Sequence, residues 1–203
     1  MDGDAVNHAQ DHFARSLDAL RAAADDKGFQ TALQAASAAM VAALKAGRKV
    51  MFAGNGGSAG DAQHIAGEFV SRLNFDRAPL AGLALTTDTS ILTAVGNDYG
   101  YEDVFSRQVA GLGQAGDVFV AITTSGNSPN ILKAIAAAKT RGILVVGMTG
   151  AKGGRMAGLC DICLHVPSES TPLIQQVYMV AAHAICGIVE EALFDRPAPK
   201  TPA

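Results

Sequence analysis

One short stretch, residues 51–68, combines a glycine-rich turn with two side chains that can transfer protons or bind a metal ion. The turn reads Gly54-Asn55-Gly56-Gly57-Ser58, and its glycines let the backbone approach a ligand and direct N–H groups at an anion. His64 and Glu68 follow at a spacing of four residues, so they lie one above the other if this segment is a helix. The stretch therefore predicts a phosphate-binding turn joined to an acid/base or metal-binding pair.

Nucleotide-binding loops offer the first comparison for this turn. As a dinucleotide fingerprint, Gly54-x-Gly56-x-x-Ala59 is a permitted variant, but the acid expected at the end of the next strand, about twenty residues on, is missing. Asp76 precedes that strand and Asp88 follows it too late. A triphosphate loop is excluded because no Gly-Lys-Ser/Thr sequence follows. A purely structural turn remains the alternative.

A second loop, residues 123–128, is rich in hydroxyl groups and precedes a predicted helix. It reads Thr123-Thr124-Ser125-Gly126-Asn127-Ser128. Ser128 suits the N-cap and Pro129 the first helical position, but capping does not require the other hydroxyls. Because neither loop contains Lys or Arg, the pair suits one phosphate group better than a triphosphate, whose transfer requires cationic groups. A sugar monophosphate is the ligand that these loops predict.

The last predicted helix adds two polar residues that change the interpretation of His64 and Glu68. Alone, that pair is typical of a helix surface or of a hydrogen-bonded core histidine. The last helix begins at Thr171-Pro172 and carries Gln175 and His183, which differ by only about 80° around the helix axis. His183 lies in an apolar run, where a polar group needs a partner. The four side chains predict a metal site or an acid/base pair with helpers.

Other histidines and cysteines give weaker signals. His8 and His12 have metal-ligand spacing, but without a third ligand nearby they indicate an exposed helix face. Cys160 and Cys163 form a lone Cys-x-x-Cys, which lacks the second half of a structural zinc site. With Cys186 the chain has three cysteines, and an odd, small number of cysteines favours reduced thiols over a disulfide framework.

The periodicity of apolar residues indicates an α/β fold. Two helices, 5–25 and 28–47, precede five short apolar runs that predict strands at 49–53, 80–85, 117–122, 143–148 and 162–166. Helices are expected between and after them, at 58–73, 89–96, 101–112, 129–140, 153–159 and 172–193. Alternation of this kind predicts a parallel sheet covered on both faces, with ligands at the carboxyl ends of its strands.

Length and composition favour one soluble domain in an oligomer. We expect residues 1–47 to form a helical pair for oligomer packing, residues 48–194 the α/β domain, and residues 195–203 a flexible tail. A net charge of -3 disfavours nucleic acid, and the 49% of hydrophobic residues favours contacts between subunits. The acidic N-terminus and the absence of an apolar run of about 18 residues predict no signal peptide, no membrane span and a cytoplasmic location.

Several motifs stand in register between about residues 45 and 194. They are Gly54-Asn55-Gly56-Gly57-Ser58, Asp61-Ala62-Gln63-His64 with Glu68, Gly96-Asn97-Asp98-Tyr99-Gly100, Phe105-Ser106-Arg107-Gln108-Val109, Thr124-Ser125-Gly126-Asn127-Ser128, and Ile174-Gln175 with His183. In this combination the chain resembles the sugar isomerase (SIS) domain family and, within it, the phosphoheptose isomerases. Those enzymes convert sedoheptulose 7-phosphate to D-glycero-D-manno-heptose 7-phosphate in the biosynthesis of nucleotide-activated heptoses for lipopolysaccharide or capsule.

The resemblance implies a fold, an assembly and a set of site residues. The fold would be a three-layer sandwich around a five-stranded parallel sheet of flavodoxin-like order, in a homotetramer with active sites near subunit contacts. The implied phosphosugar-binding residues are Asn55, Gly56, Gly57, Ser58, Glu68, Asn97, Asp98, Thr123, Thr124, Ser125, Ser128 and Gln175. The implied zinc ligands are His64, Glu68, Gln175 and His183. Glu68 and His183 would also be the base and acid of an enediol mechanism, which needs no organic cofactor.

The chain departs from the phosphoheptose isomerase pattern at a few positions. Gln176 and Tyr178 stand where an acid and a histidine are usual, which puts metal affinity in doubt, and Thr123 replaces a serine while keeping the hydroxyl. Two rival classes remain: tetrameric SIS proteins that bind a replication initiator without isomerase activity, and modules that sense a phosphosugar. The first lacks the complete Glu and His pair, and the second does not need Glu68 or His183.

Overall fold

The computed structural model describes residues 3–196, with side chains from residue 7 onwards. Its α-helices are α1 (Gly3–Asp25), α2 (Lys27–Lys45), α3 (Gly57–Val70), α4 (Thr89–Asp98), α5 (Ser106–Leu112), α6 (Pro129–Thr140) and α7 (Thr171–Leu193). Two 3-10 helices are η1 (Tyr101–Asp103) and η2 (Gly154–Gly158). The strands are β1 (Val50–Ala53), β2 (Gly82–Ala84), β3 (Val118–Ile122), β4 (Leu144–Gly150) and β5 (Ile162–Val166).

The five strands form one parallel sheet in the order β2-β1-β3-β4-β5. In the register of β1 and β3, Val50 pairs with Val118 and Ala53 with Ala121. This is the flavodoxin-like order, in which the chain leaves β1 in one direction for β2 and then returns past β1 to β3. Ligands of such sheets bind outside the carboxyl ends of the strands, at the point where the direction reverses. The predicted α/β fold and strand order are confirmed.

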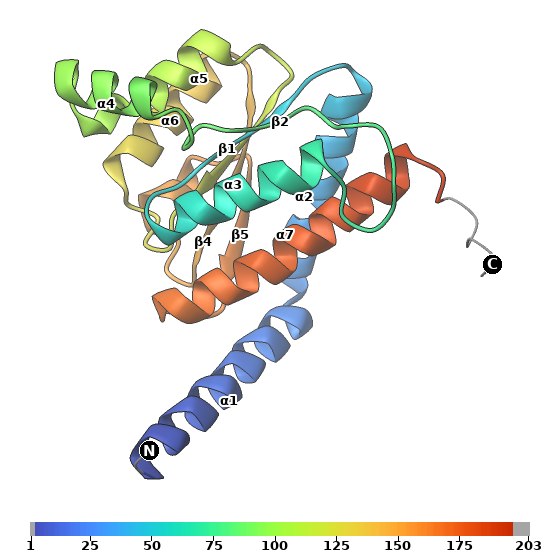
Figure 1. Ribbon diagram of the computed structural model, residues 1–203, viewed down its shortest axis with the longest axis vertical. Helices are drawn as coiled ribbons and strands as arrows, with labels where there is room; N and C mark the ends of the chain where they lie inside the picture. The colour runs from blue at the N-terminus through green and yellow to red at the C-terminus, as the bar shows by residue number, and fades with distance from the viewer. Residues whose placement is uncertain (1–2, 197–203) are drawn as a thin grey trace.

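Alternate residues of the strands point to two separate cores. Val50 and Phe52 of β1 belong to a buried cluster with residues of α1, α2, α3 and α7. Met51 and Ala53 belong to a second cluster on the opposite face, with residues of α4, α5 and α6. The molecule is therefore a three-layer sandwich, and Figure 1 shows α3 and α7 lying side by side over one face of the sheet.

The N-terminal helical pair is present, and its two helices differ in their surroundings. α2 begins after Asp26, whose side chain accepts a hydrogen bond from the Phe29 N–H at 3.0 Å, and it packs into the first core. The N-terminal part of α1 projects away from the sandwich (Figure 1), and it leaves Phe13 72% and Leu17 51% exposed. α1 therefore presents an apolar face that this single chain does not cover.

Three expected elements have different bounds. The helix predicted at 101–112 is interrupted, because Val104 and Phe105 are both buried and the Ser106 hydroxyl donates to Asp103 O at 3.2 Å, which separates η1 from α5. The helix predicted at 153–159 is the 3-10 helix η2, which begins at Gly154; both Gly154 and the preceding Gly153 have positive φ. The strand predicted at 80–85 shrinks to β2, an edge strand that pairs only with β1.

The C-terminal part of the chain ends in α7 and a short extension. α7 is long and apolar enough to cross a membrane, but half of the relevant window is buried, and core helices of soluble proteins pass the same test. The side chains of Arg196 and Glu191 form an exposed ion pair at 3.0 Å. From residue 197, the predicted tail lies outside the described residues.

Candidate functional site

The glycine-rich turn joins the carboxyl end of β1 to α3 at the reversal point of the sheet. Gly56 has φ 58°, which favours glycine, and a β-carbon at Gly54 would lie only 2.5 Å from the Ser58 carbonyl oxygen. A β-carbon at Gly57 would collide with the Gln175 amide nitrogen on α7. The turn therefore needs glycine for its backbone conformation and for the close approach of α7.

Asn55 of this turn is fixed by a residue that the sequence did not single out. Asn55 Nδ2 donates to Asn130 Oδ1 at 2.9 Å, and Asn130 Nδ2 donates to Asn55 Oδ1 at 2.8 Å. The Tyr101 hydroxyl also donates to Asn55 Oδ1 at 3.3 Å. These residues line a cavity of about 200 Å³ together with Glu102, Ser128 and Pro129.

The hydroxyl-rich loop follows β3 beside this turn. The hydroxyls of Thr123 and Ser128 lie 2.9 Å apart, and those of Thr123 and Ser125 lie 3.4 Å apart. Ser128 occupies the N-cap position of α6, but its side chain makes no capping hydrogen bond because it is turned toward Thr123. The expectation that this hydroxyl caps the helix was therefore wrong, and the group points into the loop.

A glycine-rich segment after β4 packs against this loop and forms hydrogen bonds with it. Gly126 has φ 66°, and a β-carbon there would collide with the Gly153 carbonyl oxygen. The Met156 N–H donates to Gly126 O at 3.0 Å, and the Arg155 N–H donates to Asn127 Oδ1 at 3.0 Å. The two segments thus interlock through their backbones.

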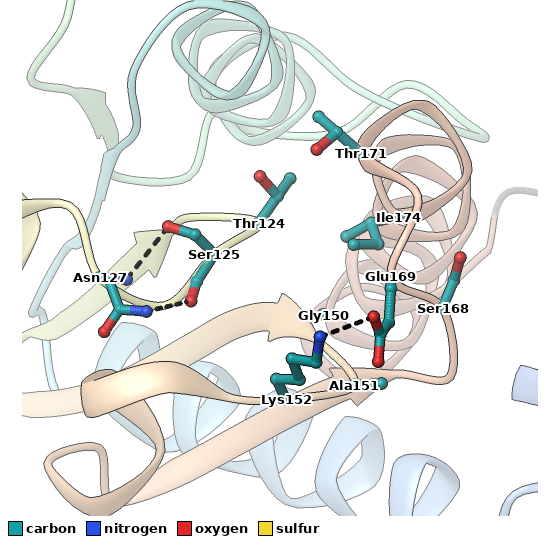
Figure 2. Close-up of a pocket in the computed structure, with 10 residues that line it drawn as sticks. All are labelled: Thr124, Ser125, Asn127, Gly150, Ala151, Lys152, Ser168, Glu169, Thr171 and Ile174. Atoms are coloured by element: carbon teal, nitrogen blue, oxygen red, sulfur yellow. Dashed lines mark hydrogen bonds and ion pairs between the residues drawn. The ribbon is translucent and has the colours of Figure 1, made fainter.

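A cavity of about 290 Å³ opens where this loop, the end of β4 and the start of α7 meet (Figure 2). It is lined by Thr124, Ser125, Asn127, Gly150, Ala151, Lys152, Ser168, Glu169, Thr171 and Ile174. Hydroxyl and backbone groups dominate, and the N-terminus of α7 adds N–H groups suited to an anion. The N-cap of α7 is Ser170 rather than the expected Thr171, and its side chain makes no capping bond.

An ion pair at the rim of this cavity was not anticipated. Lys152 Nζ lies 2.7 Å from Glu169 Oε2, and both side chains are well exposed (Figure 2). Exposed pairs of this kind contribute little to stability. Neither residue belongs to the glycine-rich turn or to the hydroxyl-rich loop, whose composition predicted a phosphate-binding site.

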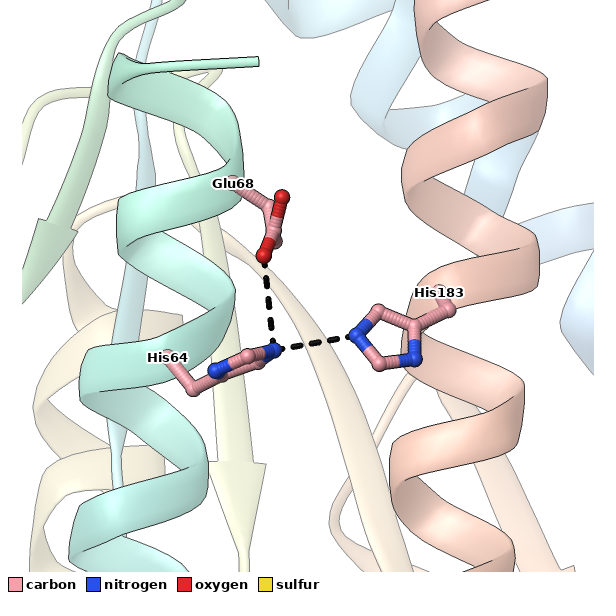
Figure 3. Close-up of side chains that lie close together, drawn as sticks. All are labelled: His64, Glu68 and His183. Atoms are coloured by element: carbon pink, nitrogen blue, oxygen red, sulfur yellow. Dashed lines mark hydrogen bonds and ion pairs between the residues drawn. The ribbon is translucent and has the colours of Figure 1, made fainter. Parts of the chain in front are cut away.

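His64, Glu68 and His183 converge between α3 and α7 (Figure 3). His64 Nε2 lies 2.9 Å from His183 Nε2 and 3.4 Å from Glu68 Oε1. Two imidazole nitrogens at 2.9 Å require that one of them donates a proton to the other. The predicted grouping of these three residues is thereby present in the structure.

The donor set fits zinc. One ligand atom from each residue lies within 4.8 Å of the others, and two imidazoles with a carboxylate are typical of zinc sites that keep an open position. Zinc–nitrogen bonds of about 2.0 Å in a tetrahedral site put ligand atoms roughly 3.3 Å apart. The Gln175 amide instead lies against Gly57, and the rise from Gln175 to His183 is about 12 Å. Gln175 as a fourth ligand stays a prediction.

The remaining predicted residues occupy different positions. Ser58 is buried in the first turn of α3, and Gly56 and Gly57 are exposed. Asn97 and Asp98 are exposed at the end of α4, where Asn97 Nδ2 donates to Asp98 Oδ1 at 2.8 Å. η1 connects this region to the turn through Tyr101.

Two of the three departures from the phosphoheptose isomerase pattern, Gln176 and Tyr178, have distinct environments. Tyr178 is buried and its hydroxyl donates to Met148 O at 2.9 Å, so it serves the core rather than the site. Gln176 Nε2 lies 2.9 Å from His12 Nε2 of α1. Neither side chain has a hydrogen bond to the His64, Glu68 and His183 cluster among the residues that the structure describes.

Three titratable groups that are partly or fully buried have shifted pKa values. Burial raises the pKa of Asp61, and the neighbouring His64 offsets part of this effect. The hydrogen bond with Cys163 and burial raise the pKa of Cys160. Burial raises the pKa of Cys186 to about 12. All three cysteines are free thiols, as expected.

Comparison with known proteins places this chain in a family. A family profile described as SIS domain matches residues 11–150. Phosphoheptose isomerase of Aneurinibacillus thermoaerophilus is 52% identical over 188 residues, which cover 93% of this chain and 95% of that protein. The structure of phosphoheptose isomerase GmhA from Neisseria gonorrhoeae matches with a TM-score of 0.85 at 42% identity, over 90% of this chain and 97% of that one. A phosphoheptose isomerase from Francisella tularensis gives a TM-score of 0.88 at 36% identity, over 92% and 98%. The chain therefore belongs to the SIS domain family and, within it, to the phosphoheptose isomerases.

Proposed function

We propose that this protein converts sedoheptulose 7-phosphate to D-glycero-D-manno-heptose 7-phosphate, for nucleotide-activated heptose biosynthesis. The observation that carries the proposal is that His183 of α7 meets Glu68 on α3, the helix that starts at the glycine-rich turn. The seven-residue step from Gly57 to His64 rises about 10 Å along α3, and His64 contacts both Glu68 and His183. A seven-carbon chain with six bonds of about 1.5 Å spans a similar distance once its phosphate is added. The spacing suits a heptose held by its phosphate at one end.

The chain's own residues divide the work between binding and proton transfer. Hydroxyl and N–H groups of the two loops bind the phosphate. The Glu68 carboxylate removes a proton from C1 of the open-chain ketose, and the His183 imidazole donates one to O2, which gives an enediol. Return of a proton to C2 and loss of the proton on O1 yields the aldose. We assign the remaining predicted residues, Asn97, Asp98 and Gln175, to the sugar hydroxyls.

We further propose that His64, Glu68 and His183 hold zinc. When bound, zinc supplies polarisation of the sugar oxygens and thereby lessens the basicity that Glu68 must provide. His64 Nε2 lies 2.9 Å from His183 Nε2, so the two rings orient each other through this hydrogen bond. No organic cofactor is required by this reaction.

The proposed assembly is a cytoplasmic homotetramer. Phe13 and Leu17 on α1 and Val180 on α7 are large apolar side chains, all more than half exposed. A cavity of about 220 Å³ between α1, α2 and α7 continues this surface. Further copies of the chain would bury these groups and bring their surfaces close to the site.

The test is an assay of the purified protein with sedoheptulose 7-phosphate, with added zinc or with chelator. We expect formation of the aldose by the wild-type protein, and a loss of kcat of at least about 100-fold in Glu68→Gln, because general base catalysis contributes that much. Glu191→Gln, an exposed carboxylate near the end of α7, is the control and should keep full activity. Absence of turnover in the wild-type protein together with tight binding of a replication initiator would move it to the rival class.

A further inference from the structure

We propose that Asn130 is a positioning residue that fixes the direction in which Asn55 presents its amide to the phosphosugar. The proposal rests on the proposed function, because Asn55 belongs to the glycine-rich turn that is assigned there to the phosphate. Asn130 is 3% exposed and lies in the first turn of α6, where backbone N–H groups have no partner within the helix. It joins the start of α6 to the glycine-rich turn after β1.

The direction of the amide is set by a backbone group. The Ile131 N–H donates to the side-chain oxygen of Asn130 at 2.9 Å. Because a backbone N–H only donates, the atom that faces it must be the oxygen of Asn130. The Asn130 nitrogen is thereby placed opposite the Asn55 oxygen, and the two amides exchange hydrogen bonds at 2.8 and 2.9 Å.

This arrangement leaves Asn55 as a donor. Its oxygen accepts from both Asn130 Nδ2 and the Tyr101 hydroxyl, and one of its N–H bonds is used by Asn130 Oδ1. The second N–H has no acceptor among the described residues, and Asn55 borders the cavity that it shares with Ser128. An N–H donor suits the acceptor oxygens of a phosphate or a sugar hydroxyl. An inverted amide would instead present an oxygen.

The experiment compares Asn130→Ala, Asn55→Ala and the double variant by kinetics with sedoheptulose 7-phosphate. We expect each single variant to raise KM about tenfold, the loss of one hydrogen bond to a charged group, with kcat changed less than about threefold. If Asn130 acts only through Asn55, the double variant should be no worse than the worse single variant. An unchanged KM in Asn130→Ala, or effects that multiply in the double variant, would overturn the proposal.

Asn130→Asp provides a second variant of nearly the same shape. Its carboxylate still accepts from Ile131 and Asn55, but it has no N–H to give to the Asn55 oxygen, so KM should rise at least as much as in Asn130→Ala. The matched control is Gln108→Ala, which removes another buried amide, one that donates to Leu85 O and Val104 O. It should lower the Tm while leaving KM within about twofold. If Gln108→Ala raises KM as much as Asn130→Ala does, the effect of Asn130 is one of stability and the proposal is wrong.

Binding measurements separate failure of this inference from failure of the proposed activity. The dissociation constant of sedoheptulose 7-phosphate is measured by calorimetry in a Glu68→Gln background, with and without Asn130→Ala. Binding that weakens about tenfold supports Asn130 even where the wild-type protein shows no turnover. Equal binding in both proteins contradicts the inference alone, whereas no binding in either contradicts the proposed substrate and, with it, the inference.

Discussion

His64 lies between the two groups proposed to move protons. It is the exposed member of the cluster, with 49% of its side chain accessible, whereas the Glu68 side chain is 20% exposed. Its exposure would give an ion a route from solvent to Glu68 and His183, the two less exposed members of the cluster. The contact of 2.9 Å between His64 and His183 is also close to the separation of two nitrogens bound to one metal ion. A single cation would replace the proton that the two rings share.

Loss of His64 should therefore affect metal content first. We expect His64→Ala to reduce zinc affinity by at least about 100-fold, because even partners of metal ligands contribute 10–100-fold. Zinc content after dialysis against a weak chelator, measured by elemental analysis, gives the result without reference to activity. His8→Ala, which removes an exposed histidine of α1, is the control and should bind as the wild-type protein does. Equal zinc content in both variants would exclude His64 as a ligand.

At the scale of single residues, sequence predicted those whose chemistry is conspicuous and missed those that act through others. His64, Glu68 and His183 were identified because their types and spacing suggest ligation, and the structure groups them. Asn130 gave no such signal. Its role depends on an amide 75 residues earlier in the chain, and only the neighbouring ends of β1 and β3 bring the two together. Its position directly after Ser128 and Pro129 was the available hint.

Among the elements, the loops after β3 and β4 depend on each other through glycines. Gly126 and Gly142 have nearly the same φ, 66° and 67°, but their surroundings differ. A β-carbon at Gly126 would collide with the Gly153 backbone, whereas one at Gly142 would meet only Ala115, in ordinary van der Waals contact at 3.5 Å from its Cβ. The two glycines thus separate the effect of backbone strain from the effect of a collision.

This difference gives a prediction about stability and binding. Gly142→Ala should lower the free energy of unfolding by about 1 kcal/mol, from strain in the left-handed region alone. Gly126→Ala should lower it by more, about 3 kcal/mol, and should also weaken phosphosugar binding, because the hydroxyl-rich loop must shift away from Gly153. Urea unfolding and calorimetric titration measure both effects. Similar losses in the two variants would show that the loops do not interlock as described.

A buried ion pair fastens α7 to the segment that follows α3. Glu190 of α7 is fully buried, and its carboxylate accepts from the backbone N–H groups of Leu73 and Asn74 and from Arg77 Nε, at 3.1, 2.8 and 3.1 Å. Arg77 in turn donates to the Glu68 carbonyl oxygen at 2.7 Å. The helices that carry Glu68 and His183 are therefore connected next to the site.

This pair predicts a pH dependence of stability. Burial alone would raise the pKa of Glu190, but the hydrogen bonds from Asn74, Leu73 and Arg77 outweigh it, so the pKa is below its usual value. Stability from this group is therefore present above the unfolded-state pKa of about 4.3 and is lost as pH falls through the lower folded-state pKa. Glu190→Gln should lower the free energy of unfolding by about 3 kcal/mol at pH 7, because Arg77 is left buried without its counter-charge.

Urea unfolding at pH 7 and in the acid range measures this effect. The difference between wild-type and Glu190→Gln proteins should shrink as the pH falls below about 4, since the wild-type carboxylate then becomes protonated. Glu191→Gln is the matched control: its exposed pair with Arg196 should contribute less than about 0.5 kcal/mol. A constant difference across pH would argue against ionised Glu190 as the source.

At the level of elements, apolar runs located all five strands, because a parallel sheet buried on both faces requires continuous hydrophobic residues. The order of the strands came from family resemblance rather than from periodicity. The break between η1 and α5 was missed because Val104 and Phe105 are adjacent, and both are buried only when the chain turns there. Such a turn is decided by packing, which a local pattern does not contain.

For the whole molecule, the exposed apolar face of α1 predicts association. Phe13→Asp should convert the proposed tetramer to smaller species, because a charge on a side chain that is 72% exposed in one chain would be buried between chains. Light scattering with size-exclusion chromatography measures the mass. Leu112→Asp, on the opposite side of the sheet and 45% exposed, is the control and should keep the tetramer. Dissociation in neither variant would place the subunit contact elsewhere.

The position of α7 as the last described helix has a consequence for the time course of synthesis. At roughly 5–20 residues per second, its 23 residues take about 1–5 s to produce. During that interval the sheet face that Ile174 and Val177 later cover remains open, so the nascent chain presents an apolar surface that chaperones recognise. His183 also arrives only then. Docking of this helix, rather than completion of the sheet, is therefore the step that would complete the proposed site.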